Sequence, residues 1–263
     1  MDIIHIVIVE DDPFARNWMA LLAARDLRIR LIGEADRPSK LISILKREVE
    51  RVDLILLDTD IPGGEDWIPR IRTTLCSINR FPKILCTGIK PDNKILSQLI
   101  DPFFCGYILK EEIQNSLAWA IALAVDGYWV ITDSVQALAA SIRHDLPKPC
   151  IVMEGRYAVQ NLTSHQEHVA RLAFLFSMER RDLADELGVT EDWGYGLVSA
   201  VYEKIGIKDA LANESDLSEY LGNYSLLNTH FERIRQQAQG TGKARDMETL
   251  AFHILTMPEM RVL

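Results

Sequence analysis

The sequence lacks any apolar run that approaches the roughly 18 residues needed for a membrane-spanning helix. Its first residues, MDIIHIVIVEDD, also lack the basic segment that opens a secretory signal peptide. The four cysteines, Cys76, Cys86, Cys105 and Cys150, show no CxxC spacing and mostly sit among apolar residues, which indicates neither a zinc site nor a disulfide framework. We therefore expect a cytoplasmic protein with buried thiols and no membrane partner.

Neither half of the chain has an excess of basic residues. The formal net charge is −9; residues 1–149 hold 18 basic against 21 acidic side chains, and residues 150–263 hold 11 against 17. This balance weighs against a strong general attraction to nucleic acid, although a local basic patch on an acidic domain remains possible.

At 263 residues the chain is long enough for two domains, each with its own core. In the first half, short apolar runs alternate with segments of helical periodicity, a pattern typical of a parallel sheet covered by helices on both faces. The runs that predict strands are 3–9, 29–35, 54–57, 83–87 and 106–109, and the segments that predict helices are 13–25, 39–49, 66–77, 93–101 and 111–126.

Polar residues close several of these predicted strands. The acidic triplet Glu10-Asp11-Asp12 follows the first strand and Asp58 the third, while Thr87 and Lys110 end the fourth and fifth. Ligands of such sheets bind beyond the carboxyl ends of the strands. Carboxylates that converge there repel one another unless a hard cation holds them, so the pattern indicates Mg²⁺. A metal, a lysine and a hydroxyl together suit a phosphoryl group in transit.

These motifs resemble the receiver domain of two-component response regulators: VEDD (9–12), DLILLDTDIPG (53–63), CTG (86–88) and GYILK (106–110). The resemblance implies a flavodoxin-like, doubly wound α/β domain with a five-stranded parallel sheet. It also implies roles for particular residues: Asp58 as phosphoacceptor; Asp11, Asp58 and the carbonyl of Asp60 as Mg²⁺ ligands, with Glu10 a ligand through water; Lys110 on the phosphoryl oxygens; and Thr87 and Tyr107 as the switch pair.

The second half carries the signals of three consecutive helices. Thr163 with Gln166 predicts a capping box, Gly188 a helix C-cap, and Thr190 the cap of a third helix. The segment resembles the LuxR-type helix-turn-helix of the NarL/FixJ group of response regulators, in which the third helix enters the major groove. We therefore expect an all-α output domain with extra C-terminal helices after it.

The third helix departs from that family at its reading surface. It carries Trp193, Gly194, Tyr195 and Leu197 where the family commonly has Thr, Val, Lys and His. Two readings of the apolar side chains stay open: an exposed patch that suits a protein interface, or side chains that fold back into the core. The candidate residues that face DNA or a partner are Thr190, Trp193, Tyr195, Leu197, Ser199 and Lys204.

We predict a cytoplasmic response regulator, not an enzyme, that accepts a phosphoryl group from a sensor histidine kinase or a small phosphodonor and regulates transcription as a homodimer. The alternative is a receiver-controlled module whose helix-turn-helix binds a protein and not DNA. The expected organisation is a receiver domain over 1–128, a partly helical linker over 129–160, a LuxR-like domain over 161–211 and a C-terminal helical extension over 212–263.

Overall fold

The chain folds into two compact units. The computed structural model describes residues 3–48, 52–62, 64–78, 81–99, 102–156, 162–207, 225–238 and 243–263. Unit 1 comprises residues 1–156 together with 258–263, and unit 2 comprises residues 157–257. Across the described residues, no helix is long and apolar enough to span a membrane.

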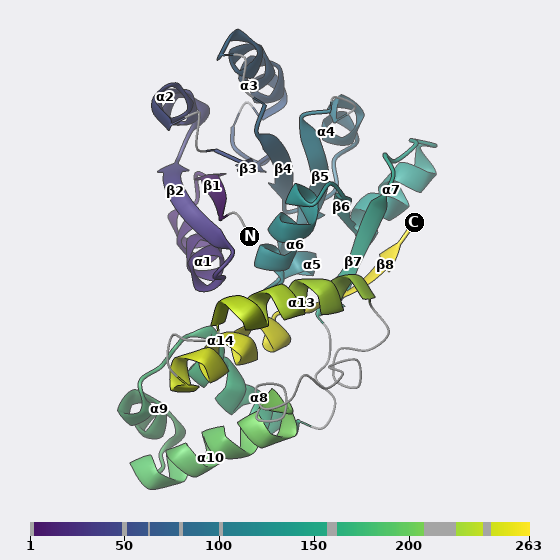
Figure 1. The fold of residues 1–263 in the computed structure, drawn as a ribbon. Helices are drawn as coiled ribbons and strands as arrows, with labels where there is room; N and C mark the ends of the chain where they lie inside the picture. The colour runs from purple at the N-terminus through teal and green to yellow at the C-terminus, as the bar shows by residue number, and fades with distance from the viewer. Residues whose placement is uncertain are drawn as a thin grey trace. The chain divides into compact units, whose positions relative to one another are not determined.

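The described residues of unit 1 form one sheet of eight strands, in the order β2-β1-β3-β4-β5-β6-β7-β8 (Figure 1). All neighbouring strands pair in parallel except the last two, β7 and β8, which pair antiparallel. The strands are β1 (Ile4–Val9), β2 (Ile29–Ala35), β3 (Leu54–Asp58), β4 (Lys83–Gly88), β5 (Phe104–Leu109), β6 (Trp129–Thr132), β7 (Cys150–Arg156) and β8 (Pro258–Val262).

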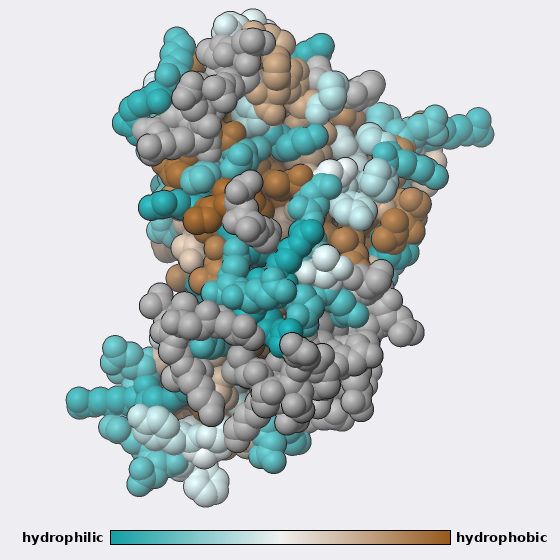
Figure 2. Space-filling view, viewed as in Figure 1, coloured by the Kyte–Doolittle hydropathy of each residue, from teal (hydrophilic) through white to brown (hydrophobic). Residues whose placement is uncertain are grey.

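Helices cover both faces of this sheet, as the alternating pattern predicted. One face packs against α2 (Pro38–Glu48), α3 (Gly64–Ile78), α4 (Asn93–Gln98) and α7 (Asp133–Ser141) in a single apolar core. The other helices in the described part of the unit are α1 (Pro13–Arg25), α5 (Lys110–Ile113) and α6 (Leu117–Val125). On the face drawn in Figure 2, hydrophilic and hydrophobic side chains are interspersed over the elements of unit 1.

Helix boundaries in unit 1 follow local signals. The Asp12 side chain accepts a hydrogen bond from the Phe14 backbone N–H, and Pro13 stands in the first turn of α1, so this helix begins where the sequence provides a cap. The helix expected over 111–126 is interrupted, because Gln114 adopts a positive φ of 45° and separates α5 from α6.

The sheet is larger than the five strands expected. Residues 129–156, expected as a partly helical linker, contain β6, α7 and β7, and these strands extend the sheet next to β5. The two prolines at 147 and 149 precede β7 rather than interrupt it. The short apolar runs WVIT and CIVM are strand signals that the helical periodicity between them obscured.

The C-terminal segment also differs from the expected helical extension. Residues 243–255 form the expected last helix, but Pro258 then begins β8, which pairs with β7 in unit 1. Unit 2 therefore lies in the chain between two adjacent strands of unit 1.

Unit 2 is helical in its described part. Its elements are α8 (Ser164–Ala170), the π-helical turn η2 (Arg171–Leu175), α9 (Arg180–Leu187), α10 (Glu191–Lys204), α13 (Ser225–Ala238) and α14 (Lys243–Leu255). In α13, Leu227, Phe231 and Ile234 are buried, while residues 212–224 of the expected helical extension lie outside the described residues.

The predicted caps of unit 2 are confirmed. Thr163 and Gln166 form a reciprocal capping box at α8, and Gly188 ends α9 in the left-handed conformation at φ 65°. The Thr190 side chain accepts a hydrogen bond from the Trp193 backbone N–H at the start of α10.

Gly106 permits the pairing of β5 with β6. A Cβ at this position would lie 1.9 Å from the Val130 carbonyl oxygen, with φ at 156°. We expect Gly106→Ala to lower the free energy of unfolding by about 3 kcal/mol, because a neighbouring strand must move. The measurement is urea unfolding followed by tryptophan fluorescence.

Gly127→Ala is the matched control for Gly106→Ala. Gly127 also has a positive φ, 101°, but a Cβ there meets nothing within 4 Å, so only backbone strain of about 1 kcal/mol is expected. Equal losses in the two variants would contradict the role of the strand contact.

Candidate functional site

Three carboxylates meet where β1 and β3 end. Glu10 and Asp11 directly follow β1, and Asp58 is the last residue of β3, so the parallel register brings them to one edge of the sheet. One carboxylate oxygen from each lies within 4.8 Å of the others. Glu10 and Asp58 are 1% and 3% exposed, whereas Asp11 is exposed. The structure thus assembles the acidic set that the sequence predicted.

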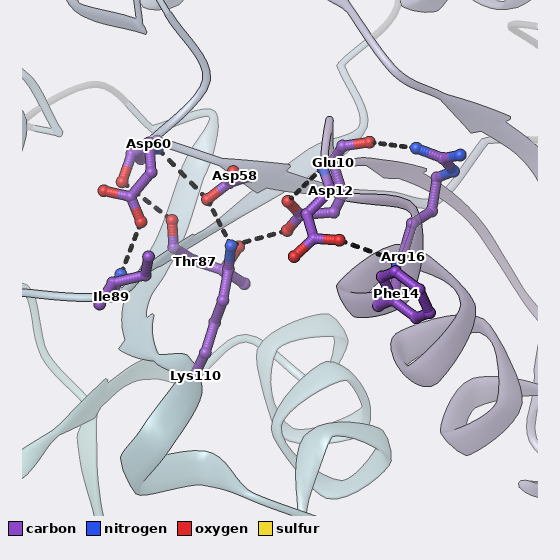
Figure 3. Close-up of polar contacts among 10 residues, drawn as sticks. Glu10, Asp12, Phe14, Arg16, Asp58, Asp60, Thr87, Ile89 and Lys110 are labelled. Atoms are coloured by element: carbon purple, nitrogen blue, oxygen red, sulfur yellow. Dashed lines mark hydrogen bonds and ion pairs between the residues drawn. The ribbon is translucent and has the colours of Figure 1, made fainter.

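Lys110 joins two of these carboxylates (Figure 3). Its Nζ lies 2.7 Å from Glu10 Oε2 and 2.9 Å from Asp58 Oδ1. Lys110 is the first residue of α5 and directly follows β5, two strands along the sheet from β3. One ammonium group therefore compensates two nearly buried carboxylates that come from different strands.

Burial changes the proton affinity of all three groups. Loss of solvation raises the pKa of Glu10 to about 7, against the partial opposition of its hydrogen bond with Lys110. Burial likewise raises the pKa of Asp58 above its usual range. For Lys110, burial lowers the pKa, but the hydrogen bonds and charges of Glu10 and Asp58 outweigh burial and leave it raised.

Besides Glu10 Oε2, which faces the Lys110 ammonium, two buried oxygens at this edge have no hydrogen-bond partner among the described residues: Asp58 Oδ2 and Thr87 Oγ1. Thr87 lies directly beside Asp58 in the register of β3 and β4. Asp58 Oδ1, in contrast, has two partners: the Lys110 ammonium and the Asp60 backbone N–H, which donates a hydrogen bond to it at 3.2 Å. The edge therefore keeps a carboxylate oxygen and a hydroxyl available to a ligand.

Asp60 and Asp12 have structural contacts of their own. The Asp60 side chain accepts a hydrogen bond from the Ile89 backbone N–H at 2.6 Å, which ties the loop after β3 to the loop after β4 (Figure 3). Asp12 caps α1, while the Glu10 carbonyl accepts a hydrogen bond from Arg16 Nη1 at 2.7 Å. The loop that carries Glu10 and Asp11 is thus held to the first turn of α1 by two hydrogen bonds.

Tyr107 is fully buried and points its hydroxyl to the loop after β4. The hydroxyl donates a hydrogen bond to the Lys90 carbonyl at 2.9 Å, and burial raises the pKa of this phenol to about 12. A Cβ at Gly88 would lie 2.9 Å from the Tyr107 hydroxyl oxygen, so this glycine makes room for the ring. The sequence indicated Tyr107 through its motif but gave no sign of the contact with Gly88.

The first half of α10 presents two aromatic residues outward. Trp193 is 63% and Tyr195 is 53% exposed, while Leu197 is partly buried. The alternative in which Trp193 folds back into the core is therefore wrong. Thr190, Ser199 and Lys204 are exposed as well, which leaves all the candidate contact residues of this helix accessible within the described part of unit 2 except Leu197.

The two glycines of α10 have different surroundings. Gly194 is buried against α9, where a Cβ would lie 3.7 Å from the Ala184 Cβ, an ordinary contact distance. Gly196 is exposed, and a Cβ there would meet nothing within 4 Å. Helix packing therefore accounts for a small residue at Gly194, and no contact among the described residues explains Gly196.

Charges around the exposed face are mixed. The Arg180 guanidinium lies 5.8 Å from the centre of the Tyr195 ring, a distance that suits a cation–π contact. Glu191 and Asp192 are exposed in the first turn of the same helix.

No protein-family model matches the chain. The chain is 22% identical over 225 residues to the Fimbriae Z protein of Escherichia coli (strain K12), covering 84% of this chain and 98% of that protein. It is 23% identical over 211 residues to the transcriptional regulatory protein LnrK of Bacillus subtilis (strain 168), covering 78% and 92%. A solved structure of the Salmonella typhimurium RcsB response regulator matches with 19% identity and a TM-score of 0.44, covering 82% of this chain and 96% of that one. The similarity to LnrK, a transcriptional regulatory protein, over most of both chains agrees with the predicted resemblance.

The raised pKa of Glu10 predicts that stability depends on pH when no divalent cation is present. Between pH 4.5 and about 7, the Glu10 carboxyl keeps its proton in the folded state but has lost it in the unfolded state, whose pKa is near 4.5. The stability that this proton contributes is therefore complete below pH 4.5 and is lost as the pH rises through about 7. We expect the free energy of unfolding to fall by roughly 2–3 kcal/mol between pH 5 and 8. Urea unfolding across this range tests it.

Glu10→Gln provides the comparison, since the amide does not titrate. Its unfolding free energy should change less with pH than that of the unsubstituted protein. The same pH dependence in both proteins would assign the effect to other groups.

Gly196→Ala should raise the unfolding free energy of unit 2 by about 0.8–1 kcal/mol, because alanine is the better helix former and its methyl group meets open space. Thermal unfolding followed by circular dichroism measures the change. A loss of stability would show that this position is constrained by a contact absent from the described residues.

Proposed function

We propose that the chain is a transcription regulator controlled by phosphorylation. Unit 1 accepts a phosphoryl group on Asp58, and residues 161–211 within unit 2 bind DNA. The observation that carries the proposal is the pairing of Lys110 with both Glu10 and Asp58 at the carboxyl ends of a parallel sheet, beside Asp11. The similarity to a transcriptional regulatory protein over 78% of the chain supports the output role.

Phosphoryl transfer requires little covalent chemistry from this site. An oxygen of the Asp58 carboxylate forms a bond to phosphorus while the bond from phosphorus to the donor breaks, and the donor leaves with that electron pair. The donor is the phosphohistidine of a sensor kinase or a small acyl phosphate. Lys110, already 2.9 Å from Asp58, would pair with the transferred oxygens and offset their charge.

The residues present fit a Mg²⁺ ion. The donor set is oxygen only, as this hard cation prefers, and Asp58 Oδ2 is buried without a hydrogen-bond partner. We assign Asp11 and Asp58 as ligands together with the Asp60 carbonyl, and Glu10 as a ligand through water. The bound ion would supply positive charge that draws the phosphoryl oxygens to the acidic edge.

Thr87 and Tyr107 form the switch in this proposal. The Thr87 hydroxyl has no hydrogen-bond partner among the described residues, so it is available to a phosphoryl oxygen on the adjacent Asp58. A movement of Thr87 would alter the neighbouring loop, to which Tyr107 donates a hydrogen bond at Lys90. The change would thereby reach the surface around α4.

The proposed DNA contact uses the exposed face of α10. The RcsB structure matched above is described as interacting with DNA, and we extend that activity to this chain. Trp193 and Tyr195 offer apolar and hydroxyl contacts, Ser199 and Lys204 lie on the same helix, and Thr190 is its N-cap residue. A homodimer would present two such helices to two half-sites.

Asp58→Asn should abolish labelling of the protein by radioactive acetyl phosphate in the presence of Mg²⁺. Asp60→Asn is the matched control, because the assigned ligand of residue 60 is its backbone carbonyl, which the substitution keeps. We expect Asp60→Asn to retain labelling. Labelling of Asp58→Asn at the level of the unsubstituted protein would refute the assignment of the phosphoacceptor.

The output role is tested by selecting bound sequences from a random duplex pool with protein activated by beryllofluoride and Mg²⁺. We expect a consensus sequence whose affinity falls as salt rises, and at least a tenfold weaker affinity for Trp193→Ala together with Tyr195→Ala. If folded and activated protein enriches no sequence, DNA binding would be contradicted. That result would favour a protein partner for the exposed surface of α10 that carries Glu191, Asp192, Trp193 and Tyr195.

A further inference from the structure

Both chain connections of unit 2 run through one strand pair of unit 1. Unit 2 begins after Arg156, the last residue of β7, and ends before Pro258, the first residue of β8. These two residues are direct partners in the antiparallel register. A change in how β8 pairs with β7 therefore acts on the attachment of unit 2 at its C-terminal end.

Side chains, in addition to the strand ladder, hold β8 in place. The Leu263 backbone N–H donates to the Cys150 carbonyl at 2.9 Å, which continues the pairing to the end of the chain. Arg261 Nη2 lies 2.8 Å from Asp133 Oδ1, and the same guanidinium bonds to Glu154 and Gln136. The N-terminal turn of α7 is thus fastened to β8.

The same turn of α7 is also hydrogen-bonded to α5, the helix that begins with Lys110. Glu112 Oε2 accepts a hydrogen bond from the Ser134 backbone N–H at 3.2 Å, and Glu112 Oε1 accepts one from the Ser134 hydroxyl. Glu112 stands two residues after Lys110 in α5. Beside it, the Leu109 backbone N–H donates to Thr132 Oγ1 at 3.2 Å, immediately before α7.

We propose that α5, α7 and β8 form a regulatory route by which phosphorylation at Asp58 changes the pairing of β8 and thereby the C-terminal attachment of unit 2. The inference rests on the proposed function, since it names the regulation of that phosphoryl site. Its steps are the shared backbone of α5, which joins Lys110 to Glu112, and the contacts of Glu112 with Ser134 and of Asp133 with Arg261.

The first step follows from charge. Lys110 Nζ is shared between Glu10 and Asp58, and a phosphoryl group on Asp58 adds anionic oxygens that compete for the same ammonium. In the proposed route, a shift of the Lys110 side chain would displace α5, because Lys110 is the first residue of this four-residue helix. The hydrogen bonds between Glu112 and Ser134 would then displace the first turn of α7. Asp133 and Gln136 would move relative to Glu154, so Arg261 could no longer bond to all three side chains at once. A contiguous set of hydrogen-bonded elements carries coupling between distant sites when it has a second arrangement, which phosphorylation would favour here.

The test is hydrogen–deuterium exchange of the full chain with and without beryllofluoride and Mg²⁺. We expect activation to speed exchange of the amides at 259–263 at least threefold. In Glu112→Ala this response should fall below 1.5-fold, whereas Glu111→Ala, an exposed neighbour on the same turn, should respond like the unsubstituted protein. Arg261→Gln should exchange rapidly at 259–263 in both conditions.

Two negative results have different meanings. If the amides at 87–92 respond to beryllofluoride while those at 259–263 do not, the phosphoryl site stands and the route through β8 is refuted. If neither region responds in folded protein, the proposed function itself fails. A full response in Glu112→Ala would also overturn the route, because α5 and α7 would then be coupled by other contacts.

Discussion

One ammonium group shared between two buried carboxylates is the constraint on which the rest of this structure depends. Without Lys110, the carboxylates of Glu10 and Asp58 would lie buried without an opposing charge, and breaking such buried pairs costs about 3–5 kcal/mol. The contact joins residues that follow β1, β3 and β5. It therefore fixes the carboxyl ends of the central strands and at the same time leaves a polar edge ready for a cation and an anionic group.

The fold extends this edge toward the rest of the chain. Three strands follow β5 in the sheet, with α7 between β6 and β7 in the chain, and the last two strands pair antiparallel. The chain therefore leaves the sheet after β7, forms unit 2 and returns as β8. Unit 2 is consequently attached to unit 1 by both of its ends. Contacts from α5 to α7 and from α7 to β8 connect the residue after β5 with the returning strand.

Most of the site was predictable from the sequence, because its residues close the predicted strands and parallel strands bring their ends together. Glu10, Asp58 and Lys110 meet as that rule requires. The strands β6 to β8 were not predicted, since a four-residue apolar run such as Trp129–Thr132 gives a weak signal beside helical segments. Contacts between distant residues, such as Arg261 with Asp133 or Gly88 with the Tyr107 hydroxyl, leave no periodic trace in the sequence.

Calorimetric titration of the full chain with Mg²⁺ tests the central claim most directly, because two adjacent aspartates have different assignments. Asp11 belongs to the carboxylate cluster, and Asp12 caps α1, a role that asparagine also fills. The account predicts one saturable site whose affinity falls at least tenfold in Asp11→Asn and stays within twofold in Asp12→Asn. Equal effects of the two substitutions, or no saturable binding by the unsubstituted protein, would contradict it.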